Sequence, residues 1–450
     1  MSGLAAGIRL AHFQKKVLIL EQHAVWGGLN SFYKKGGHHF DVGLHAVTNW
    51  LRPGYKGPRV PLQRIYRQLR IQPEELALEP QTHSYVIFGD ARLRFSNDLA
   101  ELTSEVSRLF PKELDGFVHL SERCAEYPEA AADTTPISTR RMLSEYLSDP
   151  LLVDMLLCPL LYYGCASEHD LDWEQFVILF NSIYREGFCR PRRGVRQILD
   201  VLKDRYESLG GEMRRKSGVA ELRVTDGRVG AVVLESGEVV EAEVVLSSAG
   251  RVETARLRSD HPVETGRPGE LAFTETLWLL SQDPKTLGFD GCVTFFGTAP
   301  FSWARPDQPE DLSSGVICVP GNYAHQEPLD RHLLRVTHLA DHRAWVGLSG
   351  PAYDEQKALW IERSLDTVAR LGSDLRPYIQ YTDSFTPRTV VKYTRHDHGA
   401  VYGSPDKVKT GRTDLSNLFL CGTDQGFVGI VGAMLSGINM ANAHVLAGAS

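Results

Sequence analysis

Cysteines are few in this sequence, and they form no pattern that binds a metal. Seven cysteines are spread over 450 residues, with no Cys-x-x-Cys pair and no cluster of histidines at metal-ligand spacing. We therefore expect no metal site. Scattered cysteines of this kind suit a reducing compartment, so a cytoplasmic protein is expected.

Long apolar runs and an excess of basic residues are also missing. No stretch of eighteen or more apolar residues occurs, and the first residues lack the basic segment and apolar core of a signal peptide. We expect neither a membrane-spanning helix nor a signal peptide. The formal net charge of -7 gives no basic face for phosphates, so nucleic acid is not an expected partner.

The composition that is present is that of a globular protein. The chain is 42% hydrophobic and 23% charged and contains 40 glycines, which argues against disorder, collagen and coiled coil. A chain of 450 residues is long for one compact core. Two lobes are therefore expected, and they need not be consecutive in the sequence.

The first 21 residues have the pattern of the second half of a βαβ unit. A small-residue helix begins near Gly3, and the strand Val17–Leu20 ends at Glu21. In dinucleotide folds the last glycine of GxGxxG lets the helix pack closely on the sheet, and an acid about 20 residues further on binds the ribose hydroxyls. If Gly3 and Glu21 fill these positions, the first strand and the other two glycines are expected upstream of residue 1. The alternative is a surface helix followed by an ordinary strand.

Glycine pairs follow Glu21 in an ordered series. Gly27 and Gly28 lead to Ser31, and a second pair precedes the Phe-Asp-x-Gly sequence at 40–43. Glycine lets the backbone approach a ligand where a Cβ atom would collide, so this series favours a loop beside a pyrophosphate. Either glycine pair taken alone is better explained as an ordinary turn, and only the ordered series is specific.

The C-terminal segment carries the most specific pattern. An apolar strand at 417–421 runs into Gly422, Thr423 and Asp424, and a small-residue helix begins near Gly429. Backbone N–H groups at such a helix start can face a flavin pyrimidine carbonyl, where negative charge collects on reduction. The alternative is a second Rossmann-like turn.

In order and in residue type, these motifs resemble the family of phytoene desaturases, carotenoid isomerases and retinol saturases, within the flavin amine oxidase superfamily. The TPRT sequence at 386–389 and the GAxYG sequence at 399–403 add to the resemblance. It implies FAD as the cofactor. Thr423 and Asp424 both lie where the family places a ribityl contact, and we favour Asp424. The implied cofactor contacts are Gly3, Glu21, Gly27, Gly28, Ser31, Val219, Gly422, Asp424, Gly429, Ile430 and Val431.

The resemblance also implies an α/β fold, in which a Rossmann-like FAD-binding domain of the GR2 type carries an inserted α+β substrate domain. The expected FAD-binding domain comprises residues 1–50, 194–258 and 382–450, and the substrate domain comprises 51–193 and 259–381. We expect helices over 46–193 and a β-meander of three runs, 219–224, 229–234 and 241–246. Further strands are expected at 274–280 and 343–348.

Two helices of the expected substrate domain bear on its surroundings. The segment 61–71 is amphipathic and basic, so it suits either contact with an anionic membrane surface or packing on the protein itself. Membrane association therefore stays open beside a cytoplasmic location. The apolar segment 151–163 suits a core helix or the wall of a tunnel for a long apolar substrate.

The implied activity is that of an FAD-dependent oxidoreductase acting on a long apolar isoprenoid polyene, a carotenoid or a retinoid. Desaturation, saturation and cis-trans isomerisation all proceed by hydride exchange with flavin N5 in such enzymes. The candidate catalytic residues are His45, Arg395 and His396, with His398 as a further one, although each also suits a structural role. The alternatives are a flavin amine oxidase-like enzyme acting on an amine, and a non-catalytic remnant unable to hold FAD.

Overall fold

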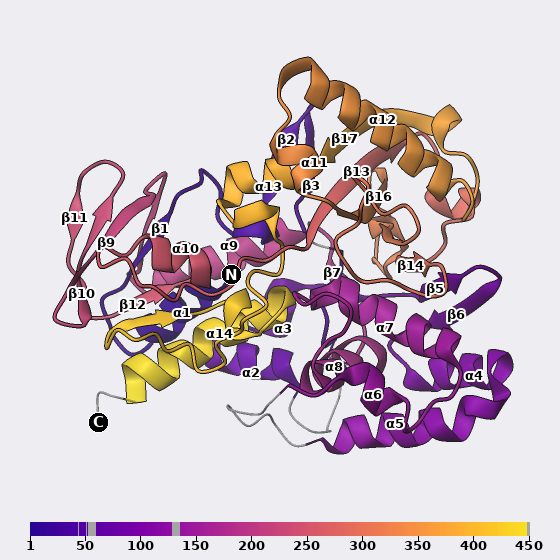
Figure 1. Ribbon diagram of the computed structural model, residues 1–450, viewed down its shortest axis with the longest axis horizontal. Helices are drawn as coiled ribbons and strands as arrows, with labels where there is room; N and C mark the ends of the chain where they lie inside the picture. Colours follow the sequence, from indigo (N-terminus) through magenta and orange to yellow (C-terminus); the bar gives the residue numbers. More distant parts are fainter. Residues whose placement is uncertain (44, 51, 53–59, 128–135, 448–450) are drawn as a thin grey trace.

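A computed structural model describes residues 1–43, 45–50, 52, 60–127 and 136–447 of the chain. The architecture is mixed α/β, with short parallel strand pairs in one region and a seven-stranded sheet in another. In Figure 1 a small meander lies at the far left, the large sheet lies toward the right, and a group of helices lies at the lower right.

Two parallel strand pairs form the framework of the first region. β1 (Leu18–Glu21) pairs with β8 (Glu212–Arg215), and β12 (Val245–Ser247) pairs with β18 (Leu418–Leu420). Among the described residues, β1 and β12 do not pair with each other. The apolar faces of three helices pack together beside these strands: α1 (Ser2–Ala11), α9 (Val195–Ser208) and α14 (Gly429–Met440).

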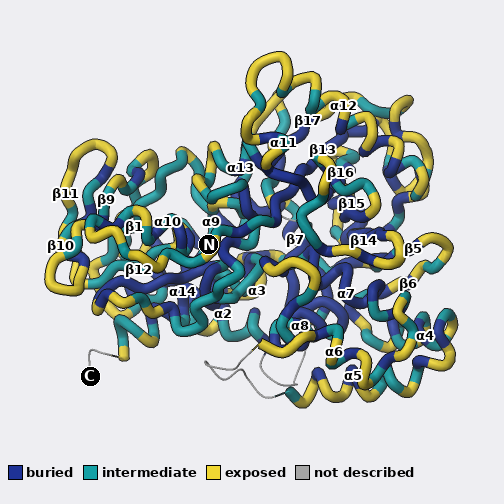
Figure 2. The backbone as a smooth tube through the Cα atoms, viewed as in Figure 1, coloured by how far each residue is buried: buried dark blue, intermediate teal, exposed yellow. Residues whose placement is uncertain are grey.

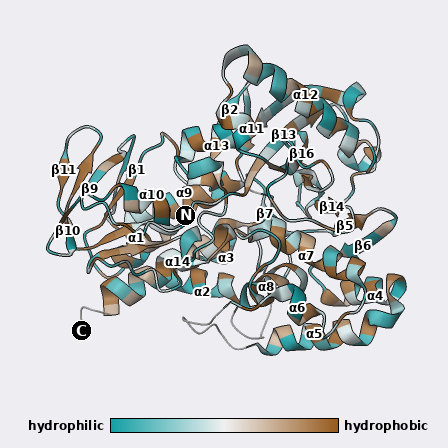
Figure 3. Ribbon diagram, viewed as in Figure 1, coloured by the Kyte–Doolittle hydropathy of each residue, from teal (hydrophilic) through white to brown (hydrophobic). Residues whose placement is uncertain are grey.

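The β-meander differs from expectation in its third run. β9 (Val219–Thr225) and β10 (Arg228–Leu234) form as predicted, and Figure 3 shows hydrophobic residues along them. The third strand, β11, is only Val239–Val240, so the prediction of a meander strand over 241–246 was wrong. The Asn417 side chain donates to the carbonyls of Val229 and Glu243, and the chain beyond Glu243 leaves the meander to pair with β18.

The seven-stranded sheet contains strands from segments far apart in the sequence. In spatial order the strands are β17 (Ile379–Phe385), β13 (Ala272–Leu280), β16 (His332–Ala340), β15 (Gly315–Cys318), β14 (Val293–Gly297), β5 (Ser84–Phe88) and β6 (Ala91–Phe95). Neighbouring strands are antiparallel except for the parallel pair of β14 and β5. All nine residues of β13 are buried.

Two sequence predictions fail in this region. Residues 46–193 are not purely helical, because β5 and β6 join the large sheet and two short strands, β4 (Leu78–Pro80) and β7 (Cys189–Pro191), pair with each other. The segment predicted as a strand at 343–348 is instead a short helix, α11 (Arg343–Val346). The Asp341 carboxylate accepts from the backbone N–H of Arg343 at 3.2 Å, which favours a helical start over an extended strand.

The remaining helices pack against the strands and against one another. α2 (Pro61–Leu69) buries its apolar stripe, Leu62, Ile65 and Leu69, in the core shared with α1 and α14. That stripe is therefore not presented to a membrane. The other helices are α3 (Pro73–Leu76), α4 (Leu99–Leu109), α5 (Leu114–Glu126), α6 (Thr139–Leu143), α7 (Pro150–Gly164), α8 (Trp173–Phe180), α10 (Arg251–Arg256), α12 (Gly350–Val368) and α13 (Pro387–Thr394).

Two apolar helices lie in the interior. α7 continues through Pro159, and most of its residues are buried in the largest core cluster, as Figure 2 shows in dark blue. The stretch Gly429–Leu446, which is α14 and the turn after it, is long and apolar enough to cross a membrane. Half of that stretch is buried inside the protein, and α14 packs against α1, as expected of a core helix.

Candidate active site

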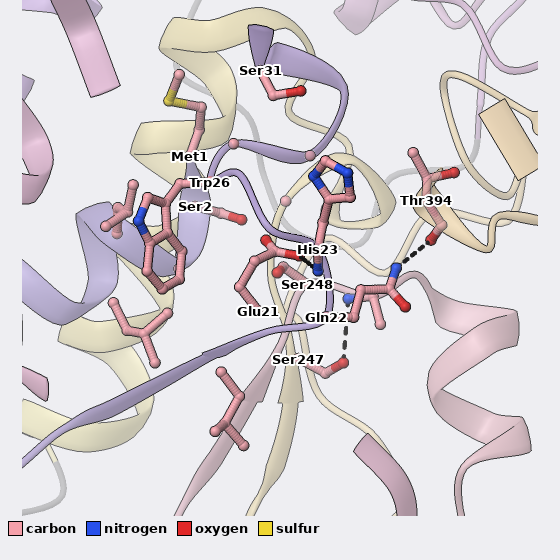
Figure 4. A pocket seen from close by; sticks show the side chains of 18 of the residues that line it. Met1, Ser2, Glu21, Gln22, His23, Trp26, Ser31, Ser247, Ser248 and Thr394 are labelled. Atoms are coloured by element: carbon pink, nitrogen blue, oxygen red, sulfur yellow. Dashed lines mark hydrogen bonds between the residues drawn. The ribbon is translucent and has the colours of Figure 1, made fainter. Parts of the chain in front are cut away.

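A cavity of about 2040 Å³ opens between the parallel strand pairs. Its wall includes the start of α1, the residues 18–21 of β1, and the residues 244–247 around β12. Figure 4 shows Glu21, Gln22 and His23 beside Ser247, the last residue of β12, and Ser248, which follows it. The facing edges of the two strand pairs thus border the same space.

Glu21 stands at the end of β1, as the sequence predicts. Its carboxylate accepts from the backbone N–H of His23 at 2.9 Å. Burial raises the pKa of Glu21, and that hydrogen bond opposes the rise. A strand-end carboxylate with an oxygen facing the cavity is suited to accept hydrogen bonds from ribose hydroxyls.

The glycine pair after β1 has two distinct roles. Both residues have left-handed backbone angles, with φ of +111° at Gly27 and +60° at Gly28. A Cβ atom at Gly27 would lie 2.5 Å from the carbonyl oxygen of Asn30, whereas one at Gly28 would meet nothing within 4 Å. Gly27 is therefore needed by the loop itself, and Gly28 leaves open space on the cavity side. Ser31, at the end of this loop, also lines the cavity.

The close approach of α1 to the strands falls on Gly7 rather than on Gly3. A Cβ atom at Gly7 would lie 2.8 Å from Ile19 Cδ1 and 2.9 Å from Tyr206 Cε2. At Gly3 it would meet nothing within 4 Å, and Gly3 lines the cavity. Gly3 therefore leaves room for a ligand, while the helix-to-strand packing expected of it belongs to Gly7.

The loop after β18 closes the other side of the cavity. Gly422, at φ +88°, and Thr423 line it, and the N–H of Gly422 donates to Ser436 Oγ at 2.6 Å. Asp424 is buried away from the lining and accepts from the backbone N–H groups of Arg251 at 2.5 Å and Ser404 at 2.9 Å. Thr423 is thus the residue of this pair that faces the cavity.

The first turn of α14 contains Gly429, Ile430 and Val431, which do not line the cavity with their side chains. Ile430 and Val431 are buried in the core, and Val428 at the N-cap makes no side-chain hydrogen bond to the helix. The first N–H groups of a helix have no partner within it. Their role as backbone donors to a flavin remains a prediction.

The candidate catalytic residues separate into two places. Arg395 and His396 line the cavity, with Arg395 Nη1 2.6 Å from Glu235 Oε1 and His396 Nδ1 3.4 Å from Glu253 Oε1. Burial lowers the pKa of His396, but the nearby carboxylates of Glu253, Asp424 and Asp397 together outweigh burial, so the pKa of His396 is raised.

His45 lies outside the cavity lining, beside the large sheet. Its Nε2 atom lies 2.9 Å from Thr337 Oγ1 and 3.2 Å from the buried carboxylate of Glu275. His398 is also absent from the lining. The structure therefore brings together only Arg395 and His396 of the four candidates.

Several cavity residues were missed by sequence reasoning. Trp26, Gln22 and His23 line the cavity, and Gln22 Nε2 donates to the carbonyl of Thr394 at 3.1 Å. A tryptophan directly before the Gly-Gly pair was the available signal, because an aromatic face next to a nucleotide loop can stack on a base. The polar residues gave no comparable signal.

Comparison with known proteins agrees with this geometry. The sequence matches the family described as flavin containing amine oxidoreductase over residues 1–444. It is 21% identical over 494 residues to prolycopene isomerase 2, chloroplastic, from an Oncidium hybrid cultivar, covering 98% of this chain and 82% of that protein. It is 24% identical over 513 residues to all-trans-retinol 13,14-reductase from Danio rerio, covering 96% and 82% of the two chains.

Solved structures share the fold at low sequence identity. An oxidoreductase from Methanosarcina mazei matches with a TM-score of 0.69 and 16% identity, covering 98% of both chains. A triple mutant of putrescine oxidase matches with a TM-score of 0.63 and 19% identity, covering 100% of this chain and 97% of that one. Together with the strand-end acid and the glycine loops around the cavity, these matches assign the chain: it belongs to the flavin containing amine oxidoreductase family and is an FAD-dependent oxidoreductase.

Proposed function

We propose that this enzyme acts on a long apolar isoprenoid polyene, by desaturation, saturation or cis-trans isomerisation. The observation that carries the proposal is the near full-length similarity to two relatives named for prolycopene and retinol. A phytoene desaturase (lycopene-forming) from Pantoea ananas is also 25% identical over 300 residues, covering 60% of this chain. All three names refer to isoprenoid polyenes, although the named reactions differ.

The position of α7 is consistent with an apolar substrate. The C-terminal end of this helix lies against the start of α14, where a Cβ atom at Gly164 would come within 2.4 Å of Val428 Cγ2. A Cβ atom at Gly429 would likewise lie 2.6 Å from the hydroxyl of Tyr163. The most apolar helix of the substrate region thus packs on the start of the helix assigned to the flavin, although none of its residues lines the cavity.

FAD, when bound, supplies hydride exchange at its N5 atom. The residues of this chain then have positioning roles: Glu21 for the ribose, Gly3 and Gly28 for close approach of phosphates, and Thr423 for the ribityl chain. Arg395 and His396 would contribute two basic side chains on the cavity wall.

The substrate test compares polyenes with an amine. The flavin-loaded protein is incubated with phytoene, all-trans-retinol, a poly-cis lycopene and putrescine, and the products are resolved by chromatography. We expect conversion of at least one polyene and none of putrescine. Oxidation of putrescine with no polyene product would instead support the amine oxidase alternative.

The cofactor residues are tested separately from the substrate. Glu21→Ala is expected to lower flavin occupancy after reconstitution, read from the absorbance near 450 nm, because it removes the ribose acceptor. Glu122→Ala serves as a control, since Glu122 is an exposed glutamate of α5 that does not line the cavity. Equal flavin occupancy in the two variants would contradict the assigned site, and no flavin in the unmodified protein would favour the non-catalytic alternative.

A further inference from the structure

Three potential metal ligands meet outside the flavin cavity. Glu270 precedes β13, His342 follows β16, and His398 lies in the short helical turn Asp397–Gly399. One ligand atom from each residue lies within 4.8 Å of the other two. None of the three lines the flavin cavity. The sequence predicted no metal site because these residues are far apart along the chain, and only folding brings them together.

The distances resemble those of a three-ligand metal site. His342 Nε2 lies 3.1 Å from Glu270 Oε2, and His398 Nδ1 lies 3.3 Å from Glu270 Oε1. Tetrahedral Zn²⁺ holds its ligand atoms at about 2.0–2.1 Å, and hence roughly 3.4 Å from one another. Both histidine-to-carboxylate separations are close to that value, and they involve the two different oxygens of Glu270. One ligand atom of each residue lies within 4.8 Å of the other two, so no separation needs to shorten by more than about 1.4 Å to reach the spacing of a tetrahedral site.

A backbone carbonyl lies beside the same nitrogen of His398. Nδ1 lies 3.0 Å from the carbonyl oxygen of Gly269 as well as 3.3 Å from Glu270 Oε1. An ion bound through Nδ1 would replace the contact with Gly269, and the proton of the neutral ring would then be on Nε2. His398 is held at φ +59°, a left-handed angle that a non-glycine residue seldom adopts. Its ring stacks on that of His342, with centroids 4.0 Å apart and an interplanar angle of 11°. Because the nitrogen lone pairs lie in the ring planes, at least one of the two rings must rotate for both histidines to bind the same ion.

A cation already competes for the carboxylate. The guanidinium of Arg305 forms an ion pair with Glu270 Oε2, and its Nε atom lies 3.8 Å from Asp341 Oδ1. Asp341 also accepts from Arg343 at 2.9 Å. Arg305 can therefore move toward Asp341 when a metal takes Glu270, and it should weaken metal binding by its charge.

We propose that Glu270, His342 and His398 bind one divalent transition-metal ion, with Zn²⁺ favoured by two imidazoles and a carboxylate. The fourth position is left to water. The ion would tie the start of β13 and the end of β16 to the turn at 397–399, which follows α13 at the wall of the flavin cavity. This site is independent of the substrate proposed above.

The test uses the full chain without a histidine tag, stripped with a chelator and titrated with Co²⁺ and with Zn²⁺ against a chromophoric chelator. We expect one ion per chain, with the visible Co²⁺ absorption of a site that contains nitrogen ligands. His342→Ala and Glu270→Gln should each weaken binding at least tenfold, by the usual effect of losing a ligand or its support. Arg305→Gln should tighten it by about tenfold, because a neighbouring cation is removed.

A matched control is available in another histidine-carboxylate pair. His83 Nε2 lies 3.3 Å from Asp290 Oδ2, beside Arg92, but with no second histidine in the group. His83→Ala should leave the titration unchanged. If His342→Ala does not fold by circular dichroism, His398→Gln replaces it, because its side chain is about a third exposed. Absence of stoichiometric binding, or binding that is unchanged in folded ligand variants, would overturn the proposal.

Discussion

Replacing Gly7 or Gly3 of α1 by alanine should change the free energy of unfolding in opposite directions. The ring of Tyr206 cannot easily retreat from Gly7, because its hydroxyl donates to the carbonyl of Val17 at 2.8 Å. In Gly7→Ala the new Cβ would lie 2.8 Å from Ile19 and 2.9 Å from that ring. Overpacking of this kind lowers the free energy of unfolding by about 1–3 kcal/mol. The higher helix propensity of alanine offsets about 1 kcal/mol of that loss.

Gly3→Ala gains the same propensity without a collision, so it should stabilise the protein by about 0.5–1 kcal/mol. The two variants should therefore differ by about 2 kcal/mol, which corresponds to roughly 2 °C in melting temperature for a chain of this length. Differential scanning calorimetry of the flavin-free proteins resolves such a difference. A Gly7→Ala variant that melts with or above Gly3→Ala would refute the assignment of the helix-to-strand contact to Gly7.

Three further predictions concern a buried glutamate, the loop after β18, and the facing edges of β1 and β12. Burial raises the pKa of Glu310 to about 8, so the folded protein keeps a proton that the unfolded chain loses above pH 4.5. Stability should then fall between those pH values, and Glu310→Gln should remove up to about 5 kcal/mol of that fall, measured by melting temperature against pH. Asp424→Asn should lower the free energy of unfolding by about 2–3 kcal/mol, because it leaves one buried backbone N–H without an acceptor. Thr423→Val should keep the melting temperature and lower flavin occupancy. A loss of flavin in Asp424→Asn at an unchanged melting temperature, with no loss in Thr423→Val, would instead favour Asp424 as the flavin contact. An apolar strand ending in Gly-x-Gly, fused before Met1, should pair with both β1 and β12 and raise flavin occupancy, and a fused strand of charged residues serves as its control.

The strands and helices that sequence reasoning found were those with a complete local signal. Val219–Thr225 and Arg228–Leu234 are β-branched and separated by an Asp-Gly turn, so their pairing is encoded within a few residues. The strand Ser84–Phe88 has comparable β-forming residues and forms a hairpin with β6 across the Gly89-Asp90 turn, so its local signal was missed. Its other partner in the sheet is β14, some 200 residues later, which no local pattern indicates. The run 343–348 was wrong for a different reason, because the local hydrogen bond to Asp341 decided the conformation over the apolar pattern.

The cofactor side of the site could be predicted further than the catalytic side. The positions of Glu21, Gly28 and Gly422 are set by the backbone, because each lies at or just after the end of a strand that borders the cavity. Their spacing along the chain could therefore be recognised from the sequence. Histidine carries no such constraint. His396 lies at the cavity, whereas His45 lies against a buried glutamate of the large sheet, and the sequence offered no means of separating them.

The strand pairs β1–β8 and β12–β18 form two separate sheets in the described part of the chain. This separation explains why one cavity contains so much of the predicted site. β1 and β12 each have a partner on one side, β8 and β18, and their other edges border the same space. In a continuous doubly wound sheet, a strand between them would fill part of that space, and ligands bind in the crevice beyond the carboxyl ends of the strands. Glu21, the loop through Gly27 and Gly28, and the residues that follow β12 and β18 all lie at those carboxyl ends. The part of the cavity beside the strands is therefore suited to polypeptide, and the part beyond their ends is suited to the cofactor.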